Sequence, residues 1–518
     1  MDRCRRDTVL DRTDGTGILK ALTKVNKIAG PPGTGKTTEL LNIVEKLLSN
    51  GTRPEEIVYT TFTRAGSYEA RDRAIQRFGY TEDEFPYFRT LHSLCYRLLG
   101  GGPVMQQRDW FGFGKQIGQA FSFGRFNDTD FTYATKGDHL LNMWGLHRAK
   151  DIPMRDVHAV YPENHVCSYA ELEHFVESCR IYKEFLGKMD YTDILERFIE
   201  EKPEIPDAKY LIVDEAQDLS ILQSKVIAHI QLTATSGVWI AGDDDQCVHE
   251  WNGADANWFI DLPADLTVLN KSYRIPASVH TLATGITDKI TNRLDKIYEP
   301  RDEVGITEFL FYEDLKMDKG QWLILCRNKV FFDWFEEYCV RNGWAFHSTS
   351  EKDKAFIDAA KAHRRLCDGQ IITIQEARHF YEYMSRKWVK HGGKKAILDA
   401  EDDLMLDAKT LVKNYGLKDL LSPLLMLDRG SAKQLSYLQS LLTENQLLEP
   451  PRIEICTIHG SKGRECDNVA ICPDMSHKTW VSYQDNPDAE HRVFYVGATR
   501  AKNRLVILSP LTTKYYEI

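Results

Sequence analysis

The sequence lacks several features that would place it in a secreted or membrane class. No stretch of its 518 residues approaches the ~20 consecutive apolar residues of a membrane-spanning helix. No apolar region of a secretory signal follows residues 1–7. Its eleven cysteines are scattered without a single C-x-x-C pair, which argues for reduced thiols and against a disulfide framework. We therefore expect a cytoplasmic protein with no membrane partner.

The sequence also lacks an excess of positive charge. Its formal net charge is −10, so the overall composition does not predict a nucleic-acid partner. Local basic patches on an acidic protein still bind phosphate backbones, so this class stays open. No internal repeat or low-complexity block occurs, and 42% hydrophobic and 27% charged residues are typical of globular domains. The length predicts several domains, each large enough for a core of its own.

One glycine-rich motif, G-x-x-x-x-G-K-T, is present in full at residues 30–37. Residues 25–29 read as a strand, and apolar residues at helical spacing follow from Thr37 to Leu48. Between them, backbone N–H groups of a glycine loop would surround phosphates, Lys36 would reach the β- and γ-phosphates, and the Thr37 hydroxyl would bind Mg²⁺. The sequence thus predicts a nucleoside triphosphatase whose nucleotide contacts are Gly30, Pro31, Pro32, Gly33, Thr34, Gly35, Lys36, Thr37 and Thr38.

Short apolar runs predict the fold class. Each is followed by a polar or glycine-containing loop, as in buried parallel strands; the runs are 57–61, 210–213, 238–241, 322–326, 453–457 and 468–471. Two long stretches interrupt them, and the second contains amphipathic helical segments at 374–390, 395–415 and 432–447. We expect an α/β protein with two parallel-sheet cores, each carrying a mostly helical insertion. The expected domains are 1–100 with 186–268, insertion 101–185, 269–350 with 451–518, and insertion 351–450.

Acidic residues follow two of the expected strands. Asp214 would hold Mg²⁺ and Glu215 would act as general base toward the attacking water. The second strand runs into residues 242–246, where three consecutive aspartates precede Gln246. Because burying three carboxylates is costly, we expect this loop to be exposed, at a metal, or both. Gln246 would sense the γ-phosphate or orient water, although the loop alone also fits a solvated acidic turn.

These motifs, taken in order, resemble those of the UvrD/Rep/PcrA group of superfamily 1 DNA helicases. The resemblance runs from residue 25 to residue 510 and is carried by segments 30–37, 60–65, 90–92, 190–195, 214–218, 242–246, 251–254, 270–274, 456–465 and 494–501. It implies two RecA-like cores, with ATP and Mg²⁺ as ligands. No nuclease domain is expected after the last motif.

The resemblance also assigns roles in nucleotide chemistry to the second core. Arg274 and Arg500 would stabilise the charge that builds up on the transferring phosphoryl group, from across the cleft. Tyr273 would stack on the base, Glu465 would contact the sugar, and Gly463 of the same motif would also bind the nucleotide. Hydrolysis would then open and close the cleft between the cores.

A path for single-stranded DNA is implied by the same family. Trp251 matches a base-stacking tryptophan, whereas a tryptophan outside this context would more often pack in a core. Side chains of the other motif loops suit phosphate contacts. The residues of this path are Thr61, Phe62, Thr63, Arg64, Thr90, His92, His249, Trp251, Asn252, Thr457 and His459.

The sequence departs from the family at the base-binding and DNA-binding positions. The family reads adenine with a glutamine upstream of the phosphate loop, but residues 1–29 contain none, and Thr38 stands where an arginine is usual. Adenine selectivity is therefore expected to be loose. His249 and Asn252 stand where the family often has tyrosine and arginine. These changes are expected to affect DNA binding and not ATP hydrolysis.

Three further features stay open between a functional and a structural interpretation. The glycine-aromatic stretch 111–126 would stack bases or bind a partner, but a locally packed loop is favoured. Arg327 matches a family arginine and equally fits a surface ion pair. A basic cluster around Trp388 would grip duplex phosphates or simply be solvated; its members are Arg386, Lys387, Lys390, Lys394 and Lys395.

Together these observations predict an ATP-dependent DNA helicase that moves 3′-to-5′ on single-stranded DNA. Its expected partners are single-stranded DNA and single-strand/duplex junctions, with repair or replication proteins recruited by the insertions. Three alternatives stay open. They are a translocase that displaces proteins with little unwinding, an RNA-directed motor, and an interaction module that uses hydrolysis as a timer.

Overall fold

The computed structural model describes residues 24–61, 64–122, 135–348 and 354–518, and its contacts divide the chain into two compact units. The first unit contains the described residues up to 122, residues 135–272, and the short stretch Arg293–Tyr298. The second contains Tyr273–Asn292 and the described part of Glu299–Ile518. The expected second core, 269–350, thus includes residues that the structure groups with the first unit. Phe62 and Thr63 lie outside the described residues, as do residues 123–126 of the glycine-aromatic stretch.

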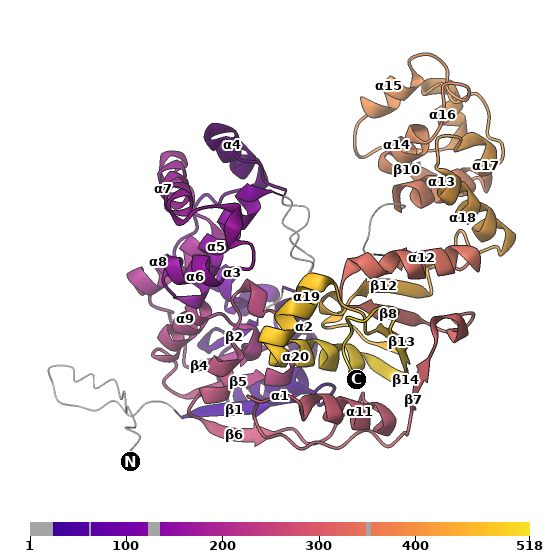
Figure 1. Cartoon of the computed structure of the whole chain (residues 1–518). Coiled ribbons are helices and arrows are strands. Elements are labelled where there is room, and N and C mark those ends of the chain that lie inside the picture. The colour runs from indigo at the N-terminus through magenta and orange to yellow at the C-terminus, as the bar shows by residue number, and fades with distance from the viewer. Residues whose placement is uncertain (1–23, 62–63, 123–134, 349–353) are drawn as a thin grey trace, which may run out of the picture. The chain divides into compact units, whose positions relative to one another are not determined.

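A six-stranded parallel sheet forms the centre of the first unit (Figure 1). Its central strands are buried at nearly every position, as expected for a sheet covered by helices on both faces. The strand order is β3 (Phe88–Thr90), β2 (Ile57–Thr61), β4 (Tyr210–Asp214), β5 (Gly237–Gly242), β1 (Val25–Ala29), β6 (Asp265–Val268). The accompanying helices are α1 (Lys36–Ser49), α2 (Arg64–Phe78), α3 (Leu91–Leu98), α8 (Tyr191–Glu201), α9 (Ile221–Gln231) and α10 (Ala256–Asp261).

Helices make up the part of the first unit inserted between α3 and α8. They are α4 (Gln107–Ile117), α5 (Lys136–Lys150), α6 (Met154–Val160) and α7 (Tyr169–Leu186), and Figure 1 shows α4, α5 and α7 grouped away from β1 and β6. A capping box between Ser168 and Glu171 begins α7. Phe113 is 1% exposed and packs against Phe121 and Phe175. Phe113 and Phe121 of the glycine-aromatic stretch are therefore packed locally, as the sequence favoured, whereas Phe111 is 42% exposed.

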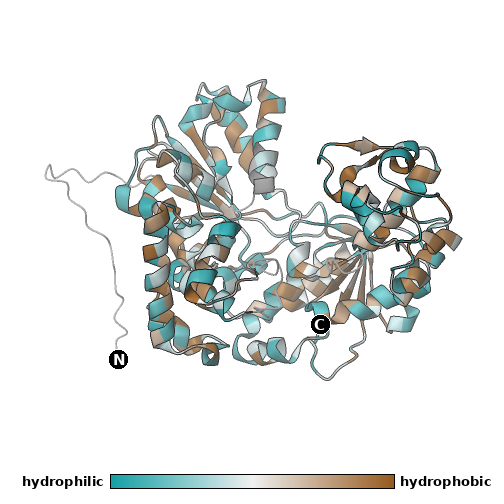
Figure 2. Ribbon diagram, turned by 90° about the horizontal axis from the view of Figure 1, so that it is seen from above, coloured by the Kyte–Doolittle hydropathy of each residue, from teal (hydrophilic) through white to brown (hydrophobic). Residues whose placement is uncertain are grey.

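The second unit is built on another six-stranded parallel sheet. Its strand order is β7 (Ile306–Leu310), β14 (Ala501–Leu508), β13 (Cys466–Cys472), β8 (Trp322–Cys326), β12 (Ile453–Thr457), β9 (Phe346–Ser348). The accompanying helices are α11 (Ala277–Thr287), α12 (Phe332–Arg341), α19 (His477–Asp485) and α20 (Pro487–Ala498). The central strands are strongly hydrophobic (Figure 2), and β8 is buried at every position. Two parallel-sheet α/β cores were expected, and the fold class is confirmed.

The insertion of the second unit has a hydrophobic core of its own. Phe356, Phe380 and Leu438 are each 0% exposed within it. Its helices are α13 (Lys354–Cys367), α14 (Ile374–Glu382), α15 (Gly393–Leu398), α16 (Ala408–Asn414), α17 (Pro423–Met426) and α18 (Ala432–Thr443), with a strand pair β10 (Ile372–Thr373) and β11 (Met405–Leu406). Among the described residues, no helix is both long and apolar enough to cross a bilayer.

A buried lysine fastens β1 to the end of α10. Lys27 is 3% exposed, and its Nζ donates to the carbonyl oxygens of Phe259 (3.0 Å), Ile260 (2.9 Å) and Leu262 (3.2 Å). These carbonyls lie at a helix end, where the backbone has no helical donors. Burial lowers the pKa of Lys27, while Asp244 and Asp261 act in the opposite direction.

Replacing this lysine is expected to destabilise the first unit. Lys27→Met keeps the aliphatic stem but leaves buried carbonyl oxygens without a donor, a loss of about 1–3 kcal/mol. For a domain of this size that corresponds to a melting temperature lower by about 2–10 °C, measured by calorimetry. Lys24→Met is the control, because Lys24 forms an exposed ion pair with Asp265 that contributes little. Equal melting of both variants would contradict the assigned role of Lys27.

Candidate nucleotide-hydrolysis site and strand-binding residues

Three loops of the first unit meet at one edge of the sheet. The strand β5 lies between β1 and β4 and pairs in parallel with both. In a parallel sheet the carboxyl ends of neighbouring strands lie side by side. The phosphate loop after β1, Asp214 and Glu215 at the end of β4, and residues 243–246 after β5 are thereby brought together.

The glycine loop has the geometry of a phosphate cradle. Gly33 and Gly35 adopt positive φ angles of 74° and 82°, and the Gly30 N–H donates to the carbonyl oxygen of Gly242 (3.0 Å). A Cβ added at Gly30 would lie 2.1 Å from Lys36 Cγ, so the lysine packs where a side chain would otherwise stand. Lys36 Nζ donates to the Gly30 carbonyl oxygen at 2.9 Å, which folds it over its own loop. Pro31, Pro32 and Thr34 are buried, whereas Thr38 is exposed.

The expected Mg²⁺ ligands are adjacent. The Thr37 hydroxyl donates to Asp214 Oδ2 at 2.8 Å, and the Tyr59 hydroxyl lies 3.2 Å from the same oxygen. Burial, followed by the charge of Glu215, raises the pKa of Asp214 to about 6, against the opposing effects of Lys36 and Thr37. Ionising a buried carboxylate is costly, and a divalent cation bound to it offsets that cost, so this donor set fits Mg²⁺. No cluster of three or more His, Cys, Asp or Glu ligands occurs among the described residues, and a phosphate-bound Mg²⁺ needs none.

The candidate base, Glu215, is placed by its backbone conformation and by a hydrogen bond to its carboxylate. Glu215 has a φ of 55°, a left-handed conformation that is uncommon for a residue other than glycine and turns the chain sharply after β4. Its Oε2 accepts a hydrogen bond from Gln217 Nε2 at 2.6 Å. Gln217 is 0% exposed, and its Oε1 in turn accepts the Asp243 N–H at 2.9 Å. Sequence reasoning did not assign a role to Gln217.

The aspartate loop differs from the expectation. Asp243, Asp244 and Asp245 are 0–1% exposed, so the loop is neither exposed nor arranged as a cluster of metal ligands. The buried ammonium group of Lys296 contacts all three carboxylates and offsets the cost that made burial unexpected. Gln246 is also buried, with Nε2 donating to Asp243 Oδ2 at 2.6 Å.

Segment 270–274, which ends in Tyr273 and Arg274, contributes residues to both units. Ser272, the last residue of its stretch in the first unit, donates its hydroxyl to the carbonyl oxygen of Pro32 in the phosphate loop at 2.8 Å. Tyr273 begins the second unit and is 76% exposed, which leaves its ring available for stacking. Arg274 Nε lies 2.6 Å from Glu465 Oε2, and Lys502 Nζ lies 2.9 Å from the other oxygen.

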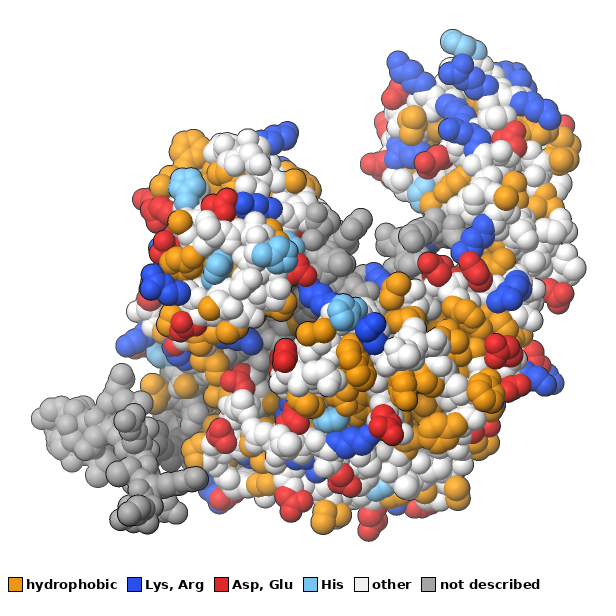
Figure 3. Space-filling view, in the orientation of Figure 1, with side chains coloured by type: hydrophobic (Ala, Val, Ile, Leu, Met, Phe, Trp, Pro, Cys, Tyr) orange, Lys and Arg blue, Asp and Glu red, His pale blue; other side chains and the backbone are white. Residues whose placement is uncertain are grey.

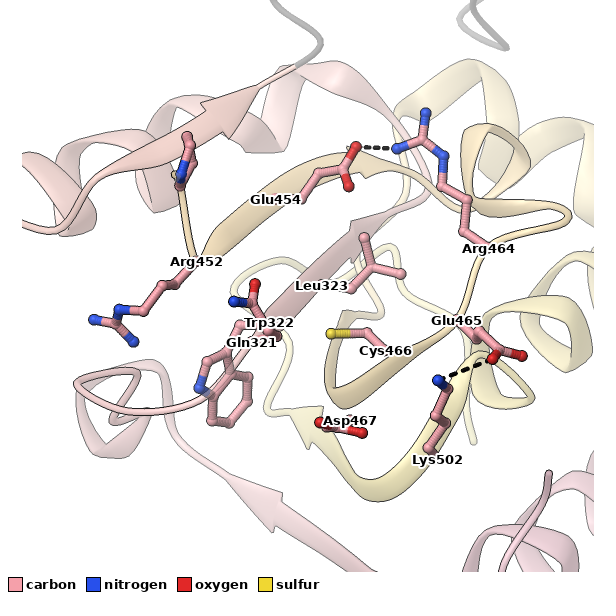
Figure 4. Close-up of a pocket in the computed structure, with 11 residues that line it drawn as sticks. Gln321, Trp322, Leu323, Arg452, Glu454, Arg464, Glu465, Cys466, Asp467 and Lys502 are labelled. Carbon is pink, nitrogen blue, oxygen red and sulfur yellow. Dashed lines mark hydrogen bonds and ion pairs between the residues drawn. The ribbon is translucent and has the colours of Figure 1, made fainter. Parts of the chain in front are cut away.

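The carboxylate of Glu465 lines a cavity of about 280 Å³ in the second unit. Figure 4 shows Glu465 and Lys502 pointing toward each other at one end of this cavity, where β13 and β14 begin. Burial alone would raise the pKa of Glu465, but Lys502 and Arg274 lower it overall. Glu465 is therefore charged at neutral pH. Gly463, two residues before it, has a φ of 79°.

Arg500 is held by main-chain oxygens of the second unit. It is 2% exposed, and its Nε and Nη1 donate to the carbonyl oxygens of Val496 (2.9 Å) and Arg464 (3.3 Å). Arg327, another arginine of this unit, pairs through two 2.7 Å contacts with Glu490. Both members of this pair are buried, so the expected ion pair is present but is not at the surface.

A cavity of about 710 Å³ adjoins segment 90–92, which carries two candidate strand-binding residues. Its lining combines aromatic and basic side chains with Thr90 and His92, including Tyr68, Arg71, Arg89 and Tyr191. Tyr191 is 57% exposed and meets His92 edge to face at 6.2 Å. Burial lowers the pKa of His92 to about 4, so the ring is neutral at pH 7. Tyr68 and Tyr191 were not singled out from the sequence, although Tyr191 lies inside a quoted motif.

The other strand-path candidates are distributed over both units. In the first unit Trp251 is half-buried and meets His249 at 6.1 Å, Asn252 is exposed, and Thr61 is only 3% exposed. Arg64 begins α2. In the second unit Thr457 and His459 are buried, and the Thr457 hydroxyl accepts the Gly460 N–H at 3.1 Å.

The basic cluster of the second insertion lies on its surface, while Trp388 does not. Trp388 is 8% exposed and its Nε1 donates to Asp428 at 3.2 Å. Figure 3 shows Lys and Arg side chains gathered on the end of this insertion that carries α15 and α16. The exposed members are Arg386, Lys387, Lys390 and Lys395.

The raised pKa of Asp214 predicts a pH-dependent stability. The folded protein keeps the Asp214 proton up to about pH 6, whereas the unfolded chain releases it near pH 4. The wild type therefore loses stability relative to Asp214→Asn as the pH rises from 4 to 6. Without ligands at pH 7 the variant should be more stable by roughly 1–3 kcal/mol, and at pH 4.5 by less. Melting curves at both pH values measure this, with exposed Asp265→Asn as control, and a gain independent of pH would contradict it.

Comparison with known proteins gives a consistent result. Residues 13–267 match the family model of the UvrD/REP helicase N-terminal domain, and residues 341–511 match that of the UvrD-like helicase C-terminal domain. DNA helicase II of Salmonella typhimurium is 26% identical over 51% of this chain and 38% of its own. ATP-dependent DNA helicase SRS2 of Saccharomyces cerevisiae is 28% identical over 45% and 22%, and PcrA of Bacillus subtilis is 22% identical over 56% and 41%. The aligned part is thus less than half of each relative. By the two domain matches, and by the motifs that build its site, the chain belongs to the UvrD/Rep family of helicases.

Proposed function

We propose that this protein is an ATP-dependent DNA helicase that moves along single-stranded DNA in the 3′-to-5′ direction. The observation that carries the proposal is the contact between the Thr37 hydroxyl and Asp214, beside a glycine loop and a lysine that fit a triphosphate. The names of the relatives, DNA helicase II and ATP-dependent DNA helicases, support DNA as the polymer.

The residues of the first unit divide the chemistry among themselves. Lys36 exchanges the Gly30 carbonyl oxygen for phosphate oxygens, a stronger, charge-assisted partner. Thr37 and Asp214 hold Mg²⁺, which when bound neutralises charge on the phosphates. Glu215 accepts the proton of the attacking water, while Gln217 keeps its carboxylate oriented. Gln246 senses the γ-phosphate or orients the attacking water.

The arginines of the second unit complete the proposed reaction. Arg274 and Arg500 stabilise the charge of the transferring phosphoryl group, and Tyr273 stacks on the base. The exposure of Tyr273 and the partial exposure of Arg274, whose side chain is 26% exposed, support these roles because both groups are accessible. Arg500 must first exchange its carbonyl partners for phosphate oxygens. That exchange gives the nucleotide a means to change the second unit.

The strand path uses stacking and neutral hydrogen bonds. Trp251 stacks on a base, and the cavity beside His92 takes the backbone and one further base through Tyr191. The neutral His92 donates or accepts a hydrogen bond without adding salt dependence. Sequence preference is therefore weak, as a translocating motor requires.

Catalysis should disappear when the phosphate or water contacts are removed. Lys36→Ala and Glu215→Gln are each expected to lower ATP turnover by about 10²–10⁴, because the former loses a charge on the phosphates and the latter cannot accept a proton. Glu215→Gln should still bind nucleotide, measured with a fluorescent ATP analogue. Lys46→Ala, an exposed lysine on the same helix, should leave turnover unchanged. Normal turnover in either site variant would rule out this assignment.

Strand coupling should depend on Trp251 and not on surface aromatics in general. Wild-type turnover should rise steeply with single-stranded DNA, and unwinding should require a 3′ tail. One base–aromatic stack is worth ~1–3 kcal/mol, so Trp251→Ala should keep basal hydrolysis but lose DNA stimulation and unwinding. Phe185→Ala, which removes an 80% exposed ring, serves as the control.

The outcomes of this assay separate the competing models. A loss of melting temperature with normal DNA stimulation in Trp251→Ala would make the ring a packing residue. Unwinding from 5′ tails would reverse the polarity. DNA-stimulated turnover without strand displacement would indicate a translocase. Stimulation by RNA alone would indicate an RNA motor, and turnover indifferent to either polymer would favour an interaction module.

A further inference from the structure

Lys296 lies outside every motif named above, yet it sits at the centre of the candidate site's buried charges. It belongs to Arg293–Tyr298, the short stretch that returns to the first unit. Its side chain is 1% exposed, and its Nζ lies 2.8 Å from Asp243 Oδ1 and 2.9 Å from Asp245 Oδ2, with Asp244 also in contact. Burial alone would lower the pKa of Lys296, but the three carboxylates raise it, so the ammonium stays charged.

The same short stretch holds the aspartates with two further groups. Arg293 binds both oxygens of Asp245, at 2.9 and 2.6 Å. The Leu294 N–H donates to Asp244 Oδ2 at 2.8 Å. Asp245 and Asp244 therefore have partners besides Lys296, and these contacts explain how the three carboxylates are tolerated in the interior.

Asp243 differs from its two neighbours because it connects Lys296 to the catalytic side chains. One carboxylate oxygen faces Lys296, and the other accepts the Nε2 hydrogen of Gln246 at 2.6 Å. The Asp243 N–H donates to Gln217, and Gln217 donates to Glu215 Oε2. Asp243 and Gln217 are both 0% exposed, so water does not compete for these bonds.

We infer that Lys296 is a positioning residue for ATP hydrolysis. By fixing Asp243 it holds Gln246, and through Gln217 the general base Glu215, in the orientation used on the nucleotide. The inference rests on the proposed function, and it adds a residue that no motif of the sequence marks. A group that acts through such contacts changes kcat more than it changes KM, because nucleotide binding by the glycine loop is left intact.

A matched pair of substitutions tests this role. Asp243→Asn and Asp245→Asn each remove one buried carboxylate beside Lys296 and keep the side-chain shape. An asparagine at 243 presents an NH₂ group either to Lys296 or to Gln246, so one of those contacts must break. The carboxylate oxygens of Asp245 instead face Arg293 and Lys296. We expect Asp243→Asn to lower the DNA-stimulated kcat by at least about tenfold with KM for ATP changed less than about threefold. Asp245→Asn should stay within about threefold of the wild type in kcat.

A second test replaces Lys296 and removes one carboxylate at the same time, so that the net charge of the cluster is kept. Lys296→Met alone leaves three buried carboxylates with too little positive charge, and it will destabilise the fold. The double variant Lys296→Met/Asp244→Asn keeps the net charge of the cluster unchanged, and Asp244→Asn alone is its control. We expect the double variant to fold, by its melting curve, and to show a kcat reduced at least about tenfold relative to Asp244→Asn.

The controls keep the two proposals apart. If the wild type turns over ATP no faster than Lys36→Ala, the proposed function is wrong and the inference fails with it. If the wild type is active but Asp243→Asn and Asp245→Asn lose kcat and melting temperature equally, Lys296 only stabilises the fold. A double variant that unfolds leaves the decision to the asparagine pair, which retains the lysine.

Discussion

The parallel pairing of β1, β5 and β4 is the constraint on which the site depends. Because the three strands run in the same direction and are neighbours, the loops at their carboxyl ends meet at one edge. Those loops carry the phosphate cradle, the Asp214–Glu215 pair and the aspartate loop. Their sequence separation is large, 177 residues between Thr37 and Asp214, and only the sheet brings the two side chains to 2.8 Å.

Two groups of buried carboxylates at this edge have different partners. Asp214 is buried with its pKa raised to about 6, a state that favours capture of a cation. Asp243, Asp244 and Asp245 are buried against Lys296 and Arg293, which supply the positive charge within the chain. Under the proposed function, the first arrangement would give up stability for metal binding, and Asp243 of the second would hold Gln246 and Gln217. Similar residue types would then serve binding at one loop and positioning at the next.

In the second unit the candidate arginines already have partners. Arg274 shares Glu465 with Lys502, and Arg500 is surrounded by carbonyl oxygens. Both sets of contacts are already charge-assisted, because the guanidinium groups are ionised. Under the proposed function, a triphosphate with its several negative charges would replace these partners and thereby alter the second unit.

The sequence alone determined the central strands and the chemistry of the loops that follow them. Runs 57–61, 322–326 and 453–457 coincide with β2, β8 and β12, because continuous burial requires continuous apolar sequence. The strands β6, β7 and β9 were not predicted from the sequence. Each lies at the edge of its sheet, and β6 and β7 are partly exposed and mix polar with apolar residues. β14 escaped because its first half is polar, with burial only from Leu505 onward.

Only the tertiary structure decided the environment of the charges. The sequence shows three aspartates in a row, and by desolvation alone they belong at the surface. Their burial depends on Lys296, which is 51 residues from Asp245 and unmarked by any motif. The same holds for Tyr191 beside His92, and for the bond between Gln217 and the Asp243 N–H. Local sequence fixes which groups are available and which element carries them, but the partner that neutralises a buried charge comes from a distant segment, so its identity follows from packing and not from periodicity.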